Sequence, residues 1–157
     1  MKSKKDNPGI HIPPPLFYIT LFFISIVLQR YFPISKSFFE HSWIGIIATI
    51  VIVFGALFIL PAFLKFLKSK NTIITVKPAN SLQTSGIYTI SRNPMYIGLL
   101  SFYIGIAFLK GNWWTFILIP IVIYIINRFV IIKEEKYLER AFGQEYLNYK
   151  AKVRRWL

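Results

Sequence analysis

The chain has 157 residues, of which 55% are apolar and only 16% are charged, a composition unlike that of an ordinary water-soluble domain. It contains no cysteine, which excludes disulfide bonds, thiolate nucleophiles and zinc–thiolate sites. The net charge of +13 raises the question of a nucleic-acid partner, and the answer depends on where the cations fall along the chain.

Two long apolar segments come first in the chain. The first extends from about Pro14 to Phe32, and the prolines at 13–15 predict a helix start, where a missing N–H costs little. No small-residue cleavage site follows it, so we expect a retained span rather than a cleaved secretory signal. The second extends from Ser42 to Leu64 and has no charge from Trp43 onward. Since about 20 apolar residues cross a bilayer core, both segments are predicted to be transmembrane helices.

Two further apolar segments form a predicted hairpin. The third, Met95–Leu109, has 15 residues and would reach about 22 Å, less than the hydrocarbon thickness. We expect either a locally thinned bilayer or a helix that begins in a recess built by other parts of the protein. A tight turn at 110–112 leads to the fourth segment, Trp113–Ile132, in which Arg128 is the only charge. The predicted fold is all-α, an integral membrane protein with about four transmembrane helices.

The cations lie mainly on one side of this four-span topology. The N-terminal segment (Lys2, Lys4, Lys5), the loop 65–94 and the chain from Arg128 onward share that side and carry 16 cations, against three in the two other loops. The positive-inside rule therefore places both termini in the cytoplasm. Topology and attraction to anionic membrane lipid explain the positive charge, so no nucleic-acid partner is needed.

The predicted cytoplasmic tail, residues 133–157, has apolar residues at roughly helical spacing with Lys and Arg between them. This pattern predicts an amphipathic helix along the membrane surface, with an interruption at Gly143 left open. The whole chain is then a single membrane domain. His11 and His41 are too isolated from each other to form a metal site.

The first polar cluster lies at the entrance to the third span. Asn93 followed by Pro94 predicts a helix N-cap and a first helical residue. The free N–H groups of a helix start carry partial positive charge, and Arg92 beside them suits a carboxylate or phosphate. Gly98 and Gly105 lie seven residues apart on one helix face, so another backbone or a flat ligand can approach closely. The alternative is that Arg92 only anchors the helix at the interface.

The second polar cluster lies near the end of the fourth span. An arginine in a span costs about 2.5–3.5 kcal/mol on insertion scales, and less near the end. Asn127 and Glu134 are seven residues apart, as are Arg128 and Glu135, so each pair is predicted to share a helix face. Adjacent glutamates suit ribose hydroxyls or a cationic ligand. The alternative is an arginine that reaches the interface and two solvated glutamates.

These clusters belong to a longer sequence pattern. It consists of Arg-Asn-Pro-Met-Tyr-Ile-Gly at 92–98, Glu-Glu-Lys-Tyr-Leu-Glu-Arg-Ala-Phe-Gly-Gln-Glu-Tyr-Leu-Asn-Tyr at 134–149 and Val-Arg-Arg-Trp at 153–156. The pattern resembles the isoprenylcysteine carboxyl methyltransferase and phospholipid methyltransferase family. The resemblance covers about residues 71–157, and the first two spans match only as generic hydrophobic helices.

In that family the matching segments bind S-adenosylmethionine in a membrane-embedded pocket open to the cytosol, and the positions of 80–83 also line it. The resemblance implies a set of cofactor-binding residues: Gln83, Tyr88, Arg92, Asn93, Pro94, Met95, Tyr96, Glu134 and Glu135. Asn93 replaces the family's usual histidine and cannot titrate near neutral pH, so we expect this position to serve binding. Arg128, with Asn127 beside it, is the candidate for holding an anionic acceptor during catalysis.

The resemblance implies direct transfer of the sulfonium methyl group to a nucleophile that enters from the lipid side. The protein would contribute alignment and exclusion of water. The acceptor is predicted to be lipophilic or membrane-borne, such as a prenylcysteine-like carboxylate or a lipid amine, and its identity is left open. One alternative is a sterol-reductase-like enzyme that uses NADPH, although 157 residues leave little room for a dinucleotide and a sterol. Another is a non-enzymatic membrane protein that retains the fold.

Overall fold

The computed structural model describes residues 7–10, 12–68 and 81–157, and within these it is all-helical with no strand, as predicted. The N-terminal lysines, His11 and Asn80 lie outside the described residues. The principal helices, in chain order, are α1 (Pro14–Tyr31), α2 (Trp43–Lys68), α3 (Pro94–Lys110), α4 (Trp113–Ile117), α5 (Ile119–Ile125), α6 (Ile132–Phe142) and α7 (Gln144–Lys152). Three short segments complete the order: the 3₁₀ turns η1 (Ser37–Glu40) and η2 (Gly86–Thr89), and the π-helical η3 (Ile126–Ile131).

The helices α1 and α2 are long and apolar enough to cross a membrane. Many of their large apolar side chains face outward: Phe23 of α1 is 62% exposed and Leu57 of α2 is 63% exposed. A water-soluble protein seldom presents such a continuous apolar surface. The outward-facing side chains therefore suit a lipid environment.

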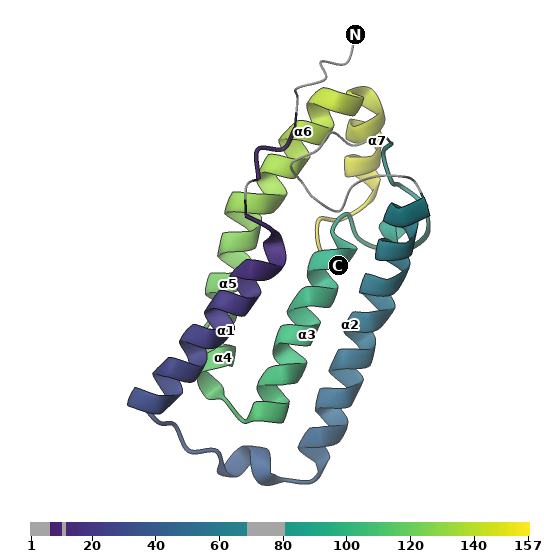
Figure 1. Ribbon diagram of the computed structural model, residues 1–157. Helices are drawn as coiled ribbons and strands as arrows, with labels where there is room; N and C mark the ends of the chain where they lie inside the picture. The colour runs from purple at the N-terminus through teal and green to yellow at the C-terminus, as the bar shows by residue number, and fades with distance from the viewer. Residues whose placement is uncertain (1–6, 11, 69–80) are drawn as a thin grey trace.

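The ends of these helices separate into two groups (Figure 1). The start of α1, the end of α2, the start of α3 and the helices α6 and α7 lie at one end of the bundle. The opposite end holds η1 and the turn between α3 and α4, where Gly111 adopts a left-handed conformation with φ 60°. The polar clusters predicted before α3 and at the start of α6 thus lie at the same end.

The closest helix pair is α2 and α3, and glycines allow their backbones to approach. A Cβ atom on Gly105 would lie 2.5 Å from Cγ1 of Ile52. A Cβ atom on Gly98 would lie 2.8 Å from the carbonyl oxygen of Gly55 and would collide with the side chain of Ile59. The close approach predicted at Gly98 and Gly105 is present, and α2 is the element that approaches.

We expect Gly98→Ala to destabilise the protein by about 1–3 kcal/mol, because the added methyl group has no space between the two helices. The matched control is Gly45→Ala in the first turn of α2, where an added Cβ would meet nothing within 4 Å. Thermal unfolding of both variants in detergent measures the difference. Equal unfolding temperatures for the two variants would contradict the tight packing of α2 on α3.

The fourth apolar segment is not one continuous α-helix. It is divided into α4, α5 and η3, and Pro120 in the first turn of α5 removes a backbone donor close to the break at Leu118. Within η3 the backbone N–H of Ile132 donates to the carbonyl oxygen of Asn127, five residues earlier. Such a wide turn holds one more residue than the corresponding α-helical turn. The helix that follows is therefore rotated relative to the sequence prediction.

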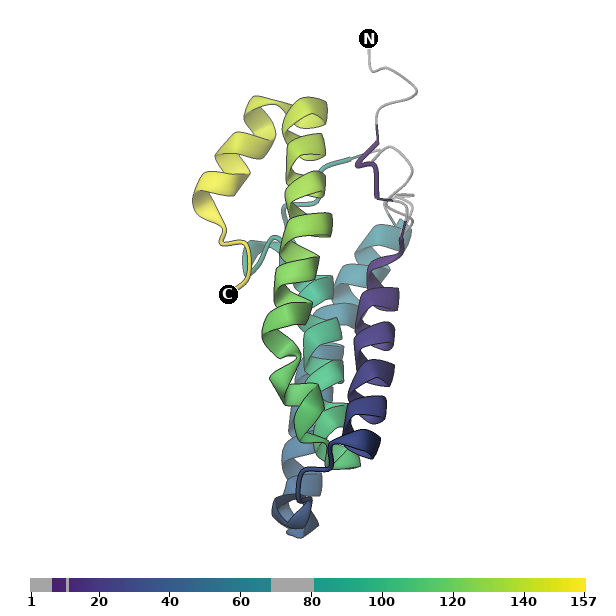
Figure 2. The ribbon, with the colours of Figure 1, turned by 90° about the vertical axis from the view of Figure 1, so that its left-hand side faces the viewer.

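The tail forms two helices rather than a single one. The helix α6 continues from η3, and α7 folds back beside it (Figure 2). Between them Gly143 has φ 53°, which other residues rarely adopt, so the interruption left open at this glycine is present. The side chains of Tyr146 and Tyr149 on α7 are buried in a cluster with Tyr88 and Ala62.

Candidate functional site

The two polar clusters of the sequence meet at the end of the bundle where α3 begins. The hydroxyl of Tyr96 in α3 donates to Oε1 of Glu134 in α6 over 2.8 Å. Nη2 of Arg92, just before α3, donates to Oε1 of Glu135 over 2.7 Å. Each of the adjacent glutamates thus contacts one residue from the entrance to α3.

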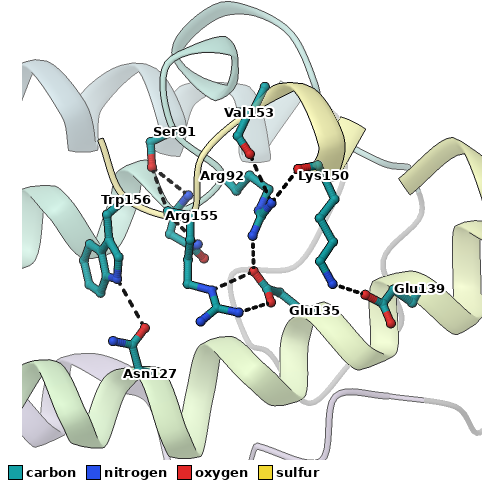
Figure 3. Close-up of polar contacts among 10 residues, drawn as sticks. Ser91, Arg92, Asn127, Glu135, Glu139, Lys150, Val153, Arg155 and Trp156 are labelled. Carbon is teal, nitrogen blue, oxygen red and sulfur yellow. Dashed lines mark hydrogen bonds and ion pairs between the residues drawn. The ribbon is translucent and has the colours of Figure 1, made fainter. Parts of the chain in front are cut away.

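Arg92 also binds the chain that follows α7 (Figure 3). Its Nη1 donates to the carbonyl oxygens of Lys150 at 2.9 Å and Val153 at 3.0 Å. Its backbone N–H donates to the carbonyl oxygen of Arg154 over 2.9 Å. Both terminal nitrogens of the guanidinium group bind the protein itself, so they do not form the open anion site that the sequence predicted beside the start of α3.

Glu135 is the centre of an ion-pair group that we call the arginine latch: Arg92, Glu135 and Arg155. Glu135 is only 6% exposed. Nε of Arg155 donates to its Oε1 at 3.0 Å and Nη2 of Arg155 to its Oε2 at 2.6 Å. Burial raises the pKa of Glu135, but the hydrogen bonds from Arg155 and the charge of Arg92 outweigh burial and hold the pKa below its usual range. The ionised carboxylate of Glu135 in α6 thus joins the entrance to α3 and the C-terminal segment, residues 153–157.

Asn93 occupies the N-cap position of α3, but its side chain makes no capping hydrogen bond. Its Nδ2 instead donates to the carbonyl oxygen of Arg155 over 2.8 Å. The hydroxyl of Ser91 accepts from the backbone N–H of Asn93 at 3.0 Å and donates to the same carbonyl at 3.2 Å. Asn93 therefore holds the C-terminal segment, and Pro94 starts the helix as predicted.

Glu134 lies in a different environment from Glu135. Burial raises its pKa to about 7, the hydrogen bond from Tyr96 opposes this rise, and the charge of Glu135 adds to it. Burial also raises the pKa of Tyr88, with further contributions from Tyr149 and Glu134. A carboxyl group that titrates near neutral pH thus lies among tyrosine side chains.

The remaining predicted residues are more dispersed. Nε2 of Gln83 donates to the hydroxyl of Ser81 over 2.8 Å, in the segment before η2. Met95 packs on the aromatic cluster that contains Tyr88. Asn127 Oδ1 accepts a hydrogen bond from Nε1 of Trp156 over 3.2 Å. Arg128 is exposed on η3, so its environment differs from that of the buried Glu135.

The prediction that Asn127 shares a helix face with Glu134, and Arg128 with Glu135, is wrong. Figure 3 shows Asn127 and Glu135 both directed toward the C-terminal segment, where they bind Trp156 and Arg155 respectively. Asn127 and Glu135 are eight residues apart, whereas the prediction paired residues seven apart. The reason is the extra residue in the π-helical turn of η3, which lengthens the repeat by one.

Sequence reasoning missed the residues that fix the C-terminal segment. Arg155 supplies two of the three hydrogen bonds to Glu135. The hydroxyl of Tyr149 donates to the carbonyl oxygen of Tyr88 over 2.6 Å and ties α7 to η2. The sequence contained an indication of Arg155, because residues 153–156 are the last part of the family pattern. No structural or binding role had been predicted for that part.

Among the described residues no group of His, Asp and Glu has an arrangement that could hold a metal ion. What the site offers instead is the carboxyl group of Glu134, which contacts Tyr96 and lies beside the arginine latch. These features suit binding of an organic cation, because carboxylates and aromatic faces both attract positive charge.

Comparison with known proteins gives a consistent set of matches. Residues 43–145 match the model of a family described as phospholipid methyltransferase. Protein-S-isoprenylcysteine O-methyltransferase B of Arabidopsis thaliana is 28% identical over 116 residues, which are 73% of this chain and 59% of that protein. The protein-S-isoprenylcysteine O-methyltransferase of Xenopus laevis is 31% identical over 116 residues, which are 73% of this chain and 40% of that protein.

A third relative is an uncharacterized protein of Haemophilus influenzae, which is 46% identical over 63 residues, 40% of this chain and the whole of that protein. No solved structure matches the chain significantly. The chain spans between 40% and 59% of the length of the two named methyltransferases.

Proposed function

The chain belongs to the phospholipid methyltransferase family, and from this premise we propose that it transfers a methyl group from S-adenosylmethionine to a lipophilic, membrane-borne acceptor. The resemblance predicted from the sequence is thereby confirmed at the level of the family. The structural observation that carries the proposal is the contact between the entrance to α3 and the glutamates of α6, through Tyr96 and Glu134.

The residues at this contact fit the chemistry of the cofactor. S-adenosylmethionine carries positive charge on its sulfonium and amino groups. Glu134, when ionised, supplies a negative charge, and the rings of Tyr88 and Tyr96 supply aromatic faces that attract cations. In the proposal these three side chains bind the cationic part of the cofactor.

The other cofactor candidates complete the proposed site. In the proposal Pro94 and Met95 form its wall at the start of α3, and Gln83, in the segment before η2, contacts the bound cofactor. The C-terminal segment is held beside that wall by Arg92 and Glu135 of the arginine latch and by the side chain of Asn93. The latch residues thus act on the cofactor by positioning the surrounding chain.

The cofactor supplies an electrophilic methyl group, and the chain supplies orientation and a dry surrounding. Arg128 and Asn127 are the proposed contacts for the acceptor, and Arg128 suits an anionic group such as a carboxylate. They lie in a π-helical segment, a type that is frequent at functional sites. A carboxylate has no proton to lose on methylation. An amine acceptor does lose one, and in the proposal the carboxylate of Glu134, whose pKa is raised to about 7, receives it.

The proposal includes a single membrane domain with four spans: α1, α2, α3 and the segment from α4 to η3. Both termini are placed in the cytoplasm by the 16 cations at that side. The site at the start of α3 then faces the compartment that contains the soluble cofactor. The acceptor reaches it from the lipid that surrounds the outward-facing apolar side chains.

Thermal unfolding in detergent tests the cofactor assignment. We expect S-adenosylhomocysteine at 100 times its dissociation constant to stabilise the protein by about 2.7 kcal/mol, and NADPH to have no effect. Tyr96→Phe, which removes the hydroxyl that contacts Glu134, should reduce the shift. Tyr124→Phe should leave it unchanged, because Tyr124 is exposed on α5.

Stabilisation by NADPH alone would favour the reductase alternative, which the named relatives do not support. No response to either nucleotide would favour a non-enzymatic membrane protein and contradict the methyltransferase proposal.

A further inference from the structure

A cavity of about 470 Å³ lies at the end of the bundle opposite the arginine latch. It is bordered by the end of α1, the chain that leads to η1 and the turn between α3 and α4. The lining residues used below are Ile26, Gln29, Arg30, Lys36, Lys110 and Asn112. None of them belongs to the proposed methyl-transfer site, so this cavity is a separate feature.

Three cationic residues line the cavity. They are Arg30 in the last turn of α1, Lys36 in the chain that leads to η1 and Lys110 at the end of α3. Within the described part of the chain none of the three forms an ion pair. Glu40 lies nearby in sequence but is not a lining residue. Like charges gathered around one space repel one another, so the arrangement favours binding of an anion.

Hydrogen bonds fix the walls of the cavity. Nε2 of Gln29 donates to the carbonyl oxygen of Ile34 over 2.8 Å, and Nε1 of Trp114 donates to that of Phe32 over 2.7 Å. Nδ2 of Asn112 donates to the hydroxyl of Ser25 over 3.0 Å, which joins the α3–α4 turn to α1. The loop and the turn are therefore held in place before any ligand arrives, which reduces the entropy lost on binding.

One lining atom has no hydrogen-bond partner among the residues that the structure describes. Oε1 of Gln29 is buried and accepts no hydrogen bond from them, although its amide nitrogen is bonded to Ile34. A buried amide oxygen normally has a donor. A ligand that brings a hydroxyl or ammonium group next to its negative charge would satisfy this oxygen.

The apolar side of the cavity distinguishes a lipid from a free anion. Ile26 lines it, and the neighbouring side chains Phe23 and Val27 of α1 are exposed. A soluble anion would use the cations but leave this apolar surface without a partner. A phospholipid would use both, with its phosphate among the cations and its acyl chains along α1.

We propose that this cavity binds the headgroup of an anionic phospholipid such as phosphatidylglycerol. The phosphate contacts Arg30, Lys36 and Lys110, and a headgroup hydroxyl donates to Oε1 of Gln29. The site is independent of the proposed methyl transfer. In the proposed topology it faces the membrane leaflet opposite the cofactor site.

Native mass spectrometry of the detergent-purified protein, titrated with phosphatidylglycerol, tests the proposal. We expect the triple variant Arg30→Gln, Lys36→Gln, Lys110→Gln to bind this lipid at least about tenfold more weakly, since each cation contributes to attraction of an anionic headgroup. The matched control removes the same charge elsewhere, by Lys133→Gln, Lys136→Gln and Lys152→Gln, all at exposed positions. The control should lose much less affinity for this lipid than the first triple variant, because its cations attract anionic lipid only from an open surface.

Equal losses in the two triple variants would overturn the proposal, because charge alone would then explain binding. Equal binding of phosphatidylcholine would overturn the anionic assignment. Complete displacement of the lipid by millimolar inorganic phosphate would assign the site to a soluble anion instead. If the first triple variant does not fold, Lys36→Gln alone, in the exposed loop, is compared with Lys133→Gln, and equal lipid binding by the two would again overturn the proposal.

Discussion

Replacing Glu135 by alanine is expected to lower the free energy of unfolding by about 3–5 kcal/mol, because it leaves a buried charge without its counter-ion. The charge is that of Arg92, whose side chain is only 10% exposed. Arg155 loses the same partner, but its side chain is 38% exposed and gains contact with solvent. The larger part of the loss therefore arises at Arg92.

The same substitution should release the C-terminal segment. Trypsin cleaves after arginine, so cleavage after Arg154 and Arg155 should become faster in the Glu135→Ala variant. Denaturant unfolding in detergent and the rate of cleavage are the two measurements. The matched control is Glu139→Ala, on the same helix as Glu135, which removes the ion pair with Lys150 of α7. That pair is about one third exposed, and its loss should cost about 0.2–1 kcal/mol.

Similar losses of stability for Glu135→Ala and Glu139→Ala would show that the latch does not hold the C-terminal segment. The substitution also separates two roles for Glu135. A residue that acts by positioning the chain should lower stability in the absence of any cofactor, whereas a direct cofactor ligand at the surface of a site need not.

Replacing Glu134 by glutamine is expected to weaken binding of S-adenosylmethionine by about 10- to 100-fold, since hydrogen bonds to charged groups contribute about 1.5–3 kcal/mol. Glutamine keeps an oxygen for the Tyr96 hydroxyl but cannot become negative. In the parent protein the carboxyl group has a pKa of about 7, so its ionised fraction increases between pH 6 and pH 8. Affinity for the positively charged cofactor should increase over the same interval, and the variant should lack this pH dependence.

Calorimetric titration at several pH values measures this effect. The matched control is Glu145→Gln, an exposed side chain on α7 that should retain the pH dependence of the parent. S-adenosylhomocysteine, which lacks the sulfonium charge, should show a smaller increase with pH than S-adenosylmethionine. A parent protein that binds S-adenosylmethionine equally well at pH 6 and pH 8 would contradict the assignment of Glu134.

The stability of the cofactor-free protein should decrease over the pH interval in which affinity for the cofactor increases. Folding raises the pKa of Glu134 from its usual value of 4.5 to about 7, so the folded state favours the protonated form. This contribution to stability is fully present below pH 4.5 and is lost as the pH rises through 7. Glu134→Gln should remove this part of the pH dependence of unfolding.

Local sequence features were sufficient to predict the helices α1, α2 and α3. Long charge-free runs marked the first two, and Asn93-Pro94 and Gly111 marked the start and end of the third. The family pattern was sufficient to bring together the entrance to α3 and the glutamates of α6. These features are visible in sequence because each depends on composition or on residues close together in the chain.

The π-helical turn and the arginine latch were beyond such reasoning. Nothing in the residues of η3 distinguishes hydrogen bonds to the fifth preceding residue from bonds to the fourth, so the faces of Asn127 and Arg128 were misassigned. The partners of Arg92 lie 43 residues away at Glu135 and 61 residues away at Val153. Only the folding back of α7 after Gly143 brings them together.

The latch also has a consequence for synthesis of the protein. Arg92 precedes Val153 by 61 residues, and at about 5–20 residues per second a ribosome needs about 3–12 seconds to make the chain between them. During that interval the guanidinium of Arg92 lacks its later partners. The proposed cofactor site therefore lacks the contacts of Arg92 until residues 153–155 have been made. A polypeptide that stops before Arg155 would contain the helices α1 to α7 but not the ion-pair group that joins them.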